Sequence, residues 1–204
     1  MTIQDCLTQM RAVKDAAFAT VDENGRPQVR IIDIMLIADD TIIFCTARGK
    51  NFYRELLRDG HIAVTCLSKD WKMLRLNGVA QRLDDQHTWI DRIFTANPSM
   101  NDVYPGDARY VLEAFCIAQG ELECFDLGVQ PIQRESFSIG NGQIAPKGFV
   151  ISDRCIGCGS CQRVCPQQAI SAGTPFVIAQ EHCLHCGLCA ETCPVGAIDR
   201  QEES

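Results

Sequence analysis

The sequence has no apolar run of the length that crosses a membrane. No stretch of its 204 residues approaches the roughly 20 consecutive apolar residues that a spanning helix needs. The first residues, MTIQDCLTQMRAVKDAAF, have no basic start followed by an apolar core, so we expect no secretion signal. These two absences predict a cytoplasmic protein without a membrane partner.

Positive charge is also scarce. Lys and Arg number 19 against 26 Asp and Glu, which leaves a formal net charge of −7. We find no basic stripe of the kind that a phosphate backbone requires, so nucleic acid is not an expected partner. Hydrophobic residues make up 46% of the chain, as in ordinary globular proteins, and the length suits one large domain plus a small one.

Cysteine, in contrast, is abundant. Eight of the 13 cysteines fall in two runs, CIGCGSCQRVCP at 155–166 and CLHCGLCAETCP at 183–194, which share the spacing Cys-x2-Cys-x2-Cys-x3-Cys-Pro. A disulfide framework is the weaker interpretation, because clustered Cys-x2-Cys runs in a reducing compartment favour metal. We expect the scattered remainder to pack as small apolar side chains: Cys6, Cys45, Cys66, Cys116 and Cys124.

The spacing of both runs is typical of 4Fe–4S ligation, in which the fourth Cys of each run binds the other cluster. One predicted ligand set is therefore Cys155, Cys158, Cys161 and Cys193. The other is Cys183, Cys186, Cys189 and Cys165. Two zinc sites are the alternative, but zinc sites pair Cys-x2-Cys halves across long gaps and need no third Cys.

Residues 148–200 thus resemble the bacterial two-cluster ferredoxins, which implies an α+β domain that transfers single electrons at low potential. Pro166 and Pro194 are expected to open two short helices, PQQAI and PVGAI. The stretch TPFVIAQEH between the runs is expected to form a strand.

The first 140 residues alternate in the manner of a mainly β domain. Apolar spacing predicts edge helices over 2–14, 47–60 and 84–97, with Thr2 capping the first of them. Six or seven antiparallel strands predict a closed barrel, with YVLEAFCIAQGELECFDL as a hairpin that turns near Gly120. The expected domains are 1–140 and 148–204, joined by a loop.

The stretch FCTARGKNF, residues 44–52, carries the chemistry of a phosphate site. A predicted strand ends at Thr46, and Arg48 and Lys50 follow where a helix begins. A hydroxyl, two cations and the free N–H groups of a helix start suit a phosphate dianion. The alternative is that both cations are ordinary solvated surface charges.

The order of RPQVRIID, FCTARGKNF and LRLNGVAQRL resembles the pyridoxamine 5'-phosphate oxidase-like, FMN-binding split-barrel family over roughly residues 8–128. The resemblance implies an antiparallel split barrel in a homodimer, with FMN at the subunit interface and one strand supplied by the second subunit. The FMN contacts that it implies are Arg30, Ile31, Ile32, Asp33, Cys45, Thr46, Arg48, Lys50, Asn51, Lys72 and Met73.

Clusters move one electron at a time, whereas FMN can take one or two. We therefore expect an oxidoreductase in which electrons pass between two 4Fe–4S clusters and FMN, which reduces or oxidises a small molecule, in an anaerobic setting. A redox protein or small molecule would be the electron donor or acceptor. Two alternatives remain open: an electron carrier without its own substrate, and a redox-sensing module that binds another ligand. The residues identify no catalytic acid or base.

Overall fold

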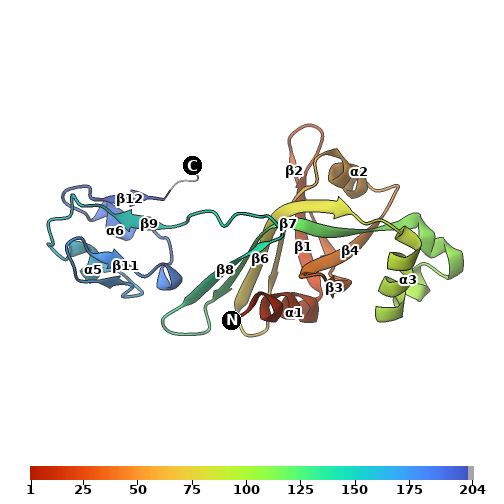
Figure 1. The fold of residues 1–204 in the computed structure, drawn as a ribbon, viewed down its shortest axis with the longest axis horizontal. Coiled ribbons are helices and arrows are strands. Elements are labelled where there is room, and N and C mark those ends of the chain that lie inside the picture. Colours follow the sequence, from red (N-terminus) through yellow and green to blue (C-terminus); the bar gives the residue numbers. More distant parts are fainter. Residues whose placement is uncertain (202–204) are drawn as a thin grey trace. The chain divides into compact units, whose positions relative to one another are not determined.

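The computed structural model describes residues 1–201, and the chain divides into two compact units (Figure 1). The first unit holds residues 1–123 and 136–144. The second unit holds the residues from 145 onward together with residues 124–135. The latter segment runs from the end of one long strand to the start of the next. No helix within residues 1–201 is long and apolar enough to span a membrane.

One antiparallel sheet dominates the first unit. Its strands are β1 (Asp15–Val21), β2 (Pro27–Asp33), β3 (Leu36–Ala38), β4 (Thr41–Ala47), β5 (His61–Leu67), β6 (Lys72–Arg82), β7 (Leu112–Asp126) and β8 (Gln133–Ile139). They follow the order β2-β1-β5-β6-β7-β4-β3, with β8 also paired to β7. Because the hydrogen-bonded path ends at β2 and β3, the expectation of a closed barrel was wrong, whereas the antiparallel split barrel that the resemblance implies is confirmed.

Helices lie at the edges of this sheet, as the sequence predicts. They are α1 (Ile3–Val13), α2 (Asn51–Arg58), α3 (Gln86–Ala96), α4 (Met100–Val103) and a 3-10 turn, η1 (Gly106–Val111). The predicted Thr2 cap is confirmed: its hydroxyl accepts from the Asp5 amide, and the Asp5 carboxylate accepts from the Thr2 amide. This reciprocal pair satisfies two amides that a helix start otherwise leaves unpaired.

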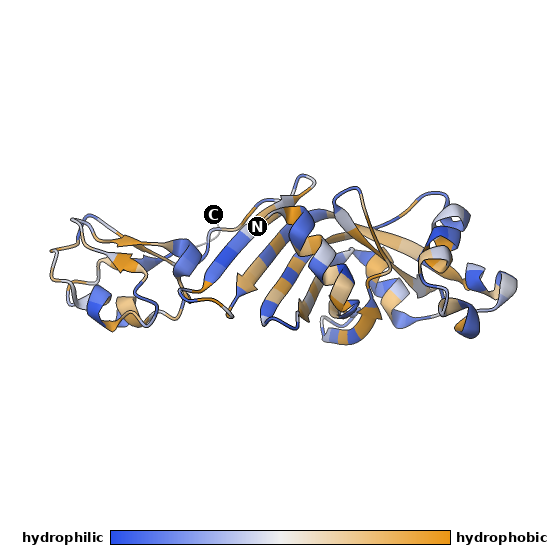
Figure 2. Cartoon of the chain, turned by 90° about the horizontal axis from the view of Figure 1, so that it is seen from below, coloured by the Kyte–Doolittle hydropathy of each residue, from blue (hydrophilic) through white to orange (hydrophobic). Residues whose placement is uncertain are grey.

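Strand β4 is buried on both faces, which explains its unbroken apolar run. On one face the Phe44 ring packs 5.0 Å from Phe18 and 5.8 Å from Phe115, with Phe52 of α2 at 5.9 Å. On the other face Ile43 and Cys45 join a core cluster under α3. Other strands alternate hydrophilic and hydrophobic bands, as expected of strands with one solvated face (Figure 2).

The hairpin expected at Gly120 is wrong, because β7 runs straight through this residue for 15 residues. A Cβ at position 120 would lie 2.2 Å from the carbonyl oxygen of Asn77 and 2.8 Å from the Cα of Gly78, both on β6. Glycine inside a strand often marks such a close backbone approach. Residue type alone does not separate this use of glycine from its use in a turn.

Gly120→Ala is therefore expected to destabilise the protein by about 1–3 kcal/mol, because the added methyl group forces two strand backbones apart. Urea denaturation of flavin-free protein measures the change. Gly49→Ala is the matched control, since no atom lies within 4 Å of a Cβ built there. Equal stability of the two variants would contradict the close approach of β6 and β7.

Two small sheets form the second unit. Strand β9 (Phe149–Ile151) pairs with β12 (Ile198–Arg200), and β10 (Ile170–Ser171) pairs with β11 (Val177–Ile178). Its helices are α5 (Ser160–Val164) and α6 (Leu188–Glu191), with a 3-10 turn, η2 (Gln180–His182). The strand expected over TPFVIAQEH is therefore shorter than predicted: only β11 forms, and the segment then continues as the turn η2.

The two helices expected after Pro166 and Pro194 were also wrong, since α5 and α6 precede these prolines. Shortly after each proline the backbone enters the left-handed region, at Gln168 (φ 52°) and Gly196 (φ 59°). That conformation ends any helical path, so both segments turn directly into β10 and β12.

Candidate functional site

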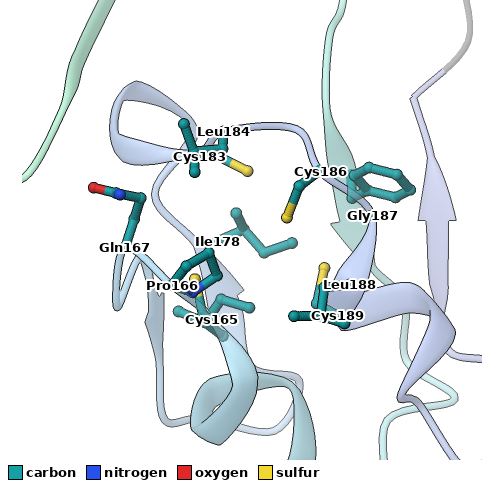
Figure 3. Close-up of a pocket in the computed structure, with 12 residues that line it drawn as sticks. Cys165, Pro166, Gln167, Ile178, Cys183, Leu184, Cys186, Gly187, Leu188 and Cys189 are labelled. Atoms are coloured by element: carbon teal, nitrogen blue, oxygen red, sulfur yellow. The ribbon is translucent and has the colours of Figure 1, made fainter. Parts of the chain in front are cut away.

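The second unit contains two cavities lined by cysteine. The first is lined by Cys155, Cys158, Cys161 and Cys193 among apolar neighbours. The second is lined by Cys165, Cys183, Cys186 and Cys189. Figure 3 shows the four sulfur atoms of the second cavity facing a common space. Each cavity thus brings together three cysteines of one run and the fourth of the other, in the predicted grouping.

The surroundings of these sulfurs suit thiolates. Backbone amides point at three of them: Ala169 N lies 3.4 Å from Cys165 Sγ, His185 N lies 3.4 Å from Cys183 Sγ, and Ala197 N lies 3.3 Å from Cys193 Sγ. A hydrogen bond from the Ser160 hydroxyl lowers the pKa of the Cys158 thiol. Burial raises the pKa of Cys161, Cys183 and Cys189, so a bound metal would be needed to hold these thiols deprotonated.

The arrangement of the sulfurs suits a cluster. Among residues 1–201, no three His, Cys, Asp or Glu side chains converge as they would around one metal ion. The four sulfurs of each cavity instead line a shared space, as ligands of an iron–sulfur cube would. His182 contacts a protein group: its Nδ1 lies 2.9 Å from the carbonyl oxygen of Ile132.

In the first unit, the side chain of Thr46 carries a buried hydroxyl group that has no hydrogen-bond partner among the described residues. Its side chain is 2% exposed, and within the described residues Oγ1 makes no hydrogen bond. Thr46 shares a face of β4 with Phe44, which stacks on Phe52 of α2. Leaving a buried polar group unsatisfied costs about 1–3 kcal/mol, so the site fits a ligand that carries hydrogen-bonding oxygens.

The start of α2 lies just beyond Thr46. Lys50 is its N-cap residue and makes no side-chain capping bond, so the first amides of the helix are left for another acceptor. Lys50 is exposed, and no ion pair within residues 1–201 holds its ammonium group. Gly49 leaves open space beside it. Asn51 is also exposed, and its side-chain oxygen accepts from Arg54.

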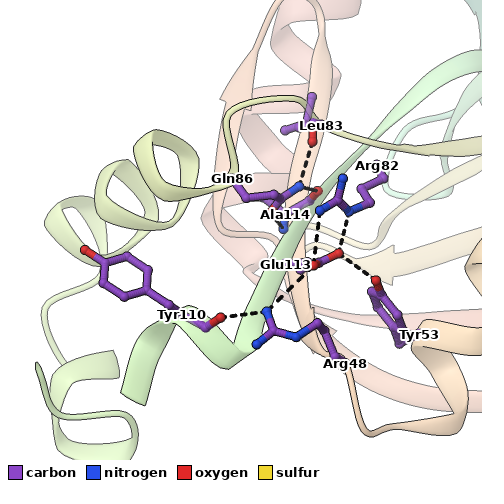
Figure 4. A network of polar contacts seen from close by, with 8 residues as sticks. All are labelled: Arg48, Tyr53, Arg82, Leu83, Gln86, Tyr110, Glu113 and Ala114. Carbon is purple, nitrogen blue, oxygen red and sulfur yellow. Dashed lines mark hydrogen bonds and ion pairs between the residues drawn. The ribbon is translucent and has the colours of Figure 1, made fainter. Parts of the chain in front are cut away.

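Arg48, the other predicted cation, is held by the protein itself (Figure 4). It donates to the carbonyl oxygen of Tyr110 at 2.7 Å and lies 3.7 Å from the Glu113 carboxylate. Glu113 is 6% exposed and also accepts from Tyr53 at 2.7 Å and from Arg82 at 3.1 Å. The hydrogen bond from Arg82 lowers the pKa of Glu113, so this carboxylate stays charged and keeps both arginines.

Sequence reasoning missed this network. Its one local signal is Glu113 itself, an acid inside the otherwise apolar stretch YVLEAFC. Acidic side chains are rarely buried unless they are paired. Its pairing with Arg48 follows only from the register of β4 and β7, which sets Glu113 opposite Thr46, two residues before Arg48.

Strand β2 presents two different faces. Val29 and Ile31 point outward and are 71% and 65% exposed. Arg30 lies on the face occupied by Ile32, where its guanidinium group contacts the buried Glu55 at 2.8 Å and stacks 4.5 Å over the Phe52 ring. The Arg30 side chain is therefore engaged inside the domain. Asp33 pairs with Lys14 at 3.0 Å.

The outward-facing surface of β2 continues across β1, β5 and β6, and we call this surface the flat floor. By register, Ile31 lies opposite Ala17, Ala17 opposite Thr65, and Thr65 opposite Arg75. Small side chains dominate the middle of this floor, which could lie against a planar ring or a second chain. On β6, Met73 lies two residues before Arg75 and so shares its face, next to Lys72.

Cys45 lies away from this region. It is buried under α3, and burial raises the pKa of its thiol to about 12, so the thiol stays neutral.

Comparison with known proteins finds a matching family model for each of the two units. Residues 4–102 match the model of the family described as pyridoxamine 5'-phosphate oxidase, and residues 154–197 match that of a 4Fe-4S dicluster domain. The chain is 31% identical over 93 residues to the dihydrophenazinedicarboxylate synthase of Pseudomonas chlororaphis. That match covers 44% of this chain and 42% of the relative.

Two solved structures, both from Clostridium acetobutylicum, share the fold. A NimC/NimA family protein superposes with a TM-score of 0.57 at 17% identity, covering 67% of this chain and 92% of its own. A protein related to general stress protein 26, of the pyridoxinephosphate oxidase family, gives 0.53 at 15% identity, covering 67% and 94%. Together these findings show that the chain joins a domain with the split-barrel fold, which matches the pyridoxamine 5'-phosphate oxidase family model, to a domain that matches the 4Fe-4S dicluster model.

Proposed function

We propose that this protein is an oxidoreductase that moves single electrons through two 4Fe–4S clusters to or from FMN. The observation that carries the proposal is the presence, in one chain, of two four-cysteine cavities and of a buried hydroxyl group, on Thr46 near the end of β4, that has no hydrogen-bond partner within the described residues. A 4Fe–4S cluster exchanges one electron at a time and FMN exchanges one or two, so their combination suits the reduction or oxidation of a small organic molecule.

The chain's own residues have distinct parts in this proposal. The eight cysteines hold the clusters among mainly apolar side chains. Thr46, Lys50 and the first amides of α2 bind the FMN phosphate, through a hydroxyl, a cation and the helix start. Arg48 supports the loop through Glu113 and contacts no phosphate in this arrangement.

A second copy of the chain completes the flavin site in this proposal. Val29, Ile31, Leu67 and Trp71 are each more than half exposed, and all lie on or beside strands of the flat floor. Apolar side chains gathered in this way mark surfaces that another molecule covers. A partner laid on this floor would enclose the flavin ring and bring its Lys72 and Met73 to the site.

The substrate is proposed to be a small organic molecule. The name of the Pseudomonas chlororaphis relative refers to a dihydrophenazine dicarboxylate, so planar aromatic acids are the first compounds to assay. Anaerobically purified protein should contain about eight irons and one FMN per chain, given two four-iron clusters. Reoxidation of the dithionite-reduced flavin by such a compound supports an enzyme. Reoxidation by protein carriers alone supports an electron carrier, and absence of flavin defeats the proposal.

Flavin retention is expected to depend on the homodimer, because each site would use residues of both chains. Serial dilution, followed by sedimentation and flavin fluorescence, measures the two together. We expect flavin to be released over the concentration range in which the dimer dissociates. A monomer that keeps one FMN per chain would contradict a shared site.

A further inference from the structure

Residues 124–135, which we call the arm, extend from the end of β7 to the start of β8 and belong to the second unit. Ile132 anchors the arm and is 3% exposed. Its amide donates to Gln167 Oε1 at 3.4 Å, and its carbonyl oxygen accepts from His182 Nδ1 at 2.9 Å. Gln167 lines the second cysteine cavity, and His182 immediately precedes one of its cysteines (Figure 3). The arm is thus fastened beside that cavity.

The arm also carries a cationic side chain, that of Arg134. The guanidinium group of Arg134 stacks 4.3 Å over the ring of Phe125, which is itself buried. This contact helps to hold the Arg134 side chain in place. Arg134 lies two residues after Ile132, whose carbonyl oxygen accepts from His182, the residue directly before Cys183. The arm therefore brings this positive charge into the neighbourhood of the second cavity.

The first cavity lacks the anchors of the arm. With the two cysteine runs aligned at their 28-residue offset, Arg154 before the first run matches His182 before the second, and Val195 after the second run matches Gln167 after the first. Arg154 instead pairs with Asp199 at 2.6 Å, where both side chains are more than half exposed. The two residues that bind Ile132 thus both belong to the surroundings of the second cavity, and neither has a like residue at the matching position.

The local charges of the repeats differ as well. In the first repeat Arg163 donates to the Cys158 carbonyl oxygen at 3.2 Å and to Ser160 Oγ at 3.0 Å, beside the first cavity. The corresponding residue of the second repeat is Glu191, an acid. The second repeat thus has no cation at the position from which the first repeat supplies one.

We propose that Arg134 of the arm replaces this missing cation and raises the reduction potential of the cluster held by Cys165, Cys183, Cys186 and Cys189. The inference rests on the proposed function, since it assumes that the cavities hold clusters. Reduction brings one electron from an external reductant onto the cluster, and a nearby positive charge stabilises the reduced form. The arm would then influence the potential of one cluster, while the other depends on the cation of its own cysteine run.

The test is an anaerobic titration with dithionite, in which electron paramagnetic resonance follows the potential of each cluster. Arg134→Gln should make reduction of one cluster about tenfold less favourable, which for one electron is 59 mV. Arg163→Gln, the matched variant, should shift the other cluster. Arg134→Lys, which keeps the charge, should leave the potential close to that of the unmodified protein.

Three outcomes would overturn the inference: Arg134→Gln shifts neither potential, it shifts the same cluster as Arg163→Gln, or Arg134→Lys lowers the potential as much as the glutamine variant does. Iron content and circular dichroism check that each variant is folded. Arg134→Met, which keeps an apolar contact for Phe125, takes the place of the glutamine variant if that one loses iron. Unmodified protein without two clusters would overturn the proposed function itself, whereas two clusters with unmoved potentials would overturn only the role of Arg134.

Discussion

Cys193→Ala is expected to remove the cluster of the first cavity, although three of the four cysteines there belong to the other run. The variant leaves that cavity with Cys155, Cys158 and Cys161. Iron content should fall by about half or more, because a 4Fe–4S cluster needs its fourth thiolate. The second unit should also lose stability, since cluster binding contributes folding free energy. Iron and sulfide analysis with electron paramagnetic resonance measures the loss.

Two further variants make this result decisive. Cys161→Ala, in the first run, should remove the same resonance signal as Cys193→Ala, whereas Cys189→Ala should remove the other signal. Cys116→Ala, which lies in the barrel and outside both runs, is the control and should retain full iron. The crossed assignment would be wrong if Cys193→Ala and Cys189→Ala abolished the same signal.

Lys50→Glu is expected to weaken FMN binding at least tenfold while both clusters remain intact. A charge-assisted hydrogen bond contributes about 1.5–3 kcal/mol, and a tenfold change in affinity corresponds to about 1.4 kcal/mol. The substitution removes this contact and adds repulsion against a phosphate dianion. Fluorescence titration of flavin-free protein with FMN gives the dissociation constant, and iron analysis confirms the clusters.

Arg26→Glu is the control for this variant, because it makes the same change of charge at an exposed position in the turn between β1 and β2. It should bind FMN as the unmodified protein does. Full flavin occupancy in Lys50→Glu would remove the main support for a phosphate site at the start of α2.

Local patterns were sufficient where chemistry depends on neighbours in the chain. The start of α1 followed from Thr2 and Asp5, which satisfy each other's amides within one turn. The grouping of the cysteines followed from their spacing, because two-residue gaps let three sulfurs of one loop face a single point. The split-barrel family was identified from the order of three short motifs, and the family match and the fold agree with it.

Local patterns failed where a residue type serves two purposes. Gly120 suggested a turn, yet it lets two strands approach closely, and only the neighbouring Asn77 decides between these uses. The prolines after each cysteine run suggested helix starts, yet the backbone beyond them turns into a strand. In both cases the deciding contact or dihedral angle belongs to the folded chain.

The sequence by itself determined the kinds of chemistry available: eight grouped thiols, and a hydroxyl and cations where a helix begins. Tertiary structure decided which of these groups are free to act. Arg48 is held by Glu113, which only the pairing of β4 with β7 brings near. Arg134 belongs to an arm that Ile132 fastens beside the second cavity, through its bonds to Gln167 and His182. Electrostatic interactions depend on distance in space and on burial, and neither quantity can be deduced from separation along the chain.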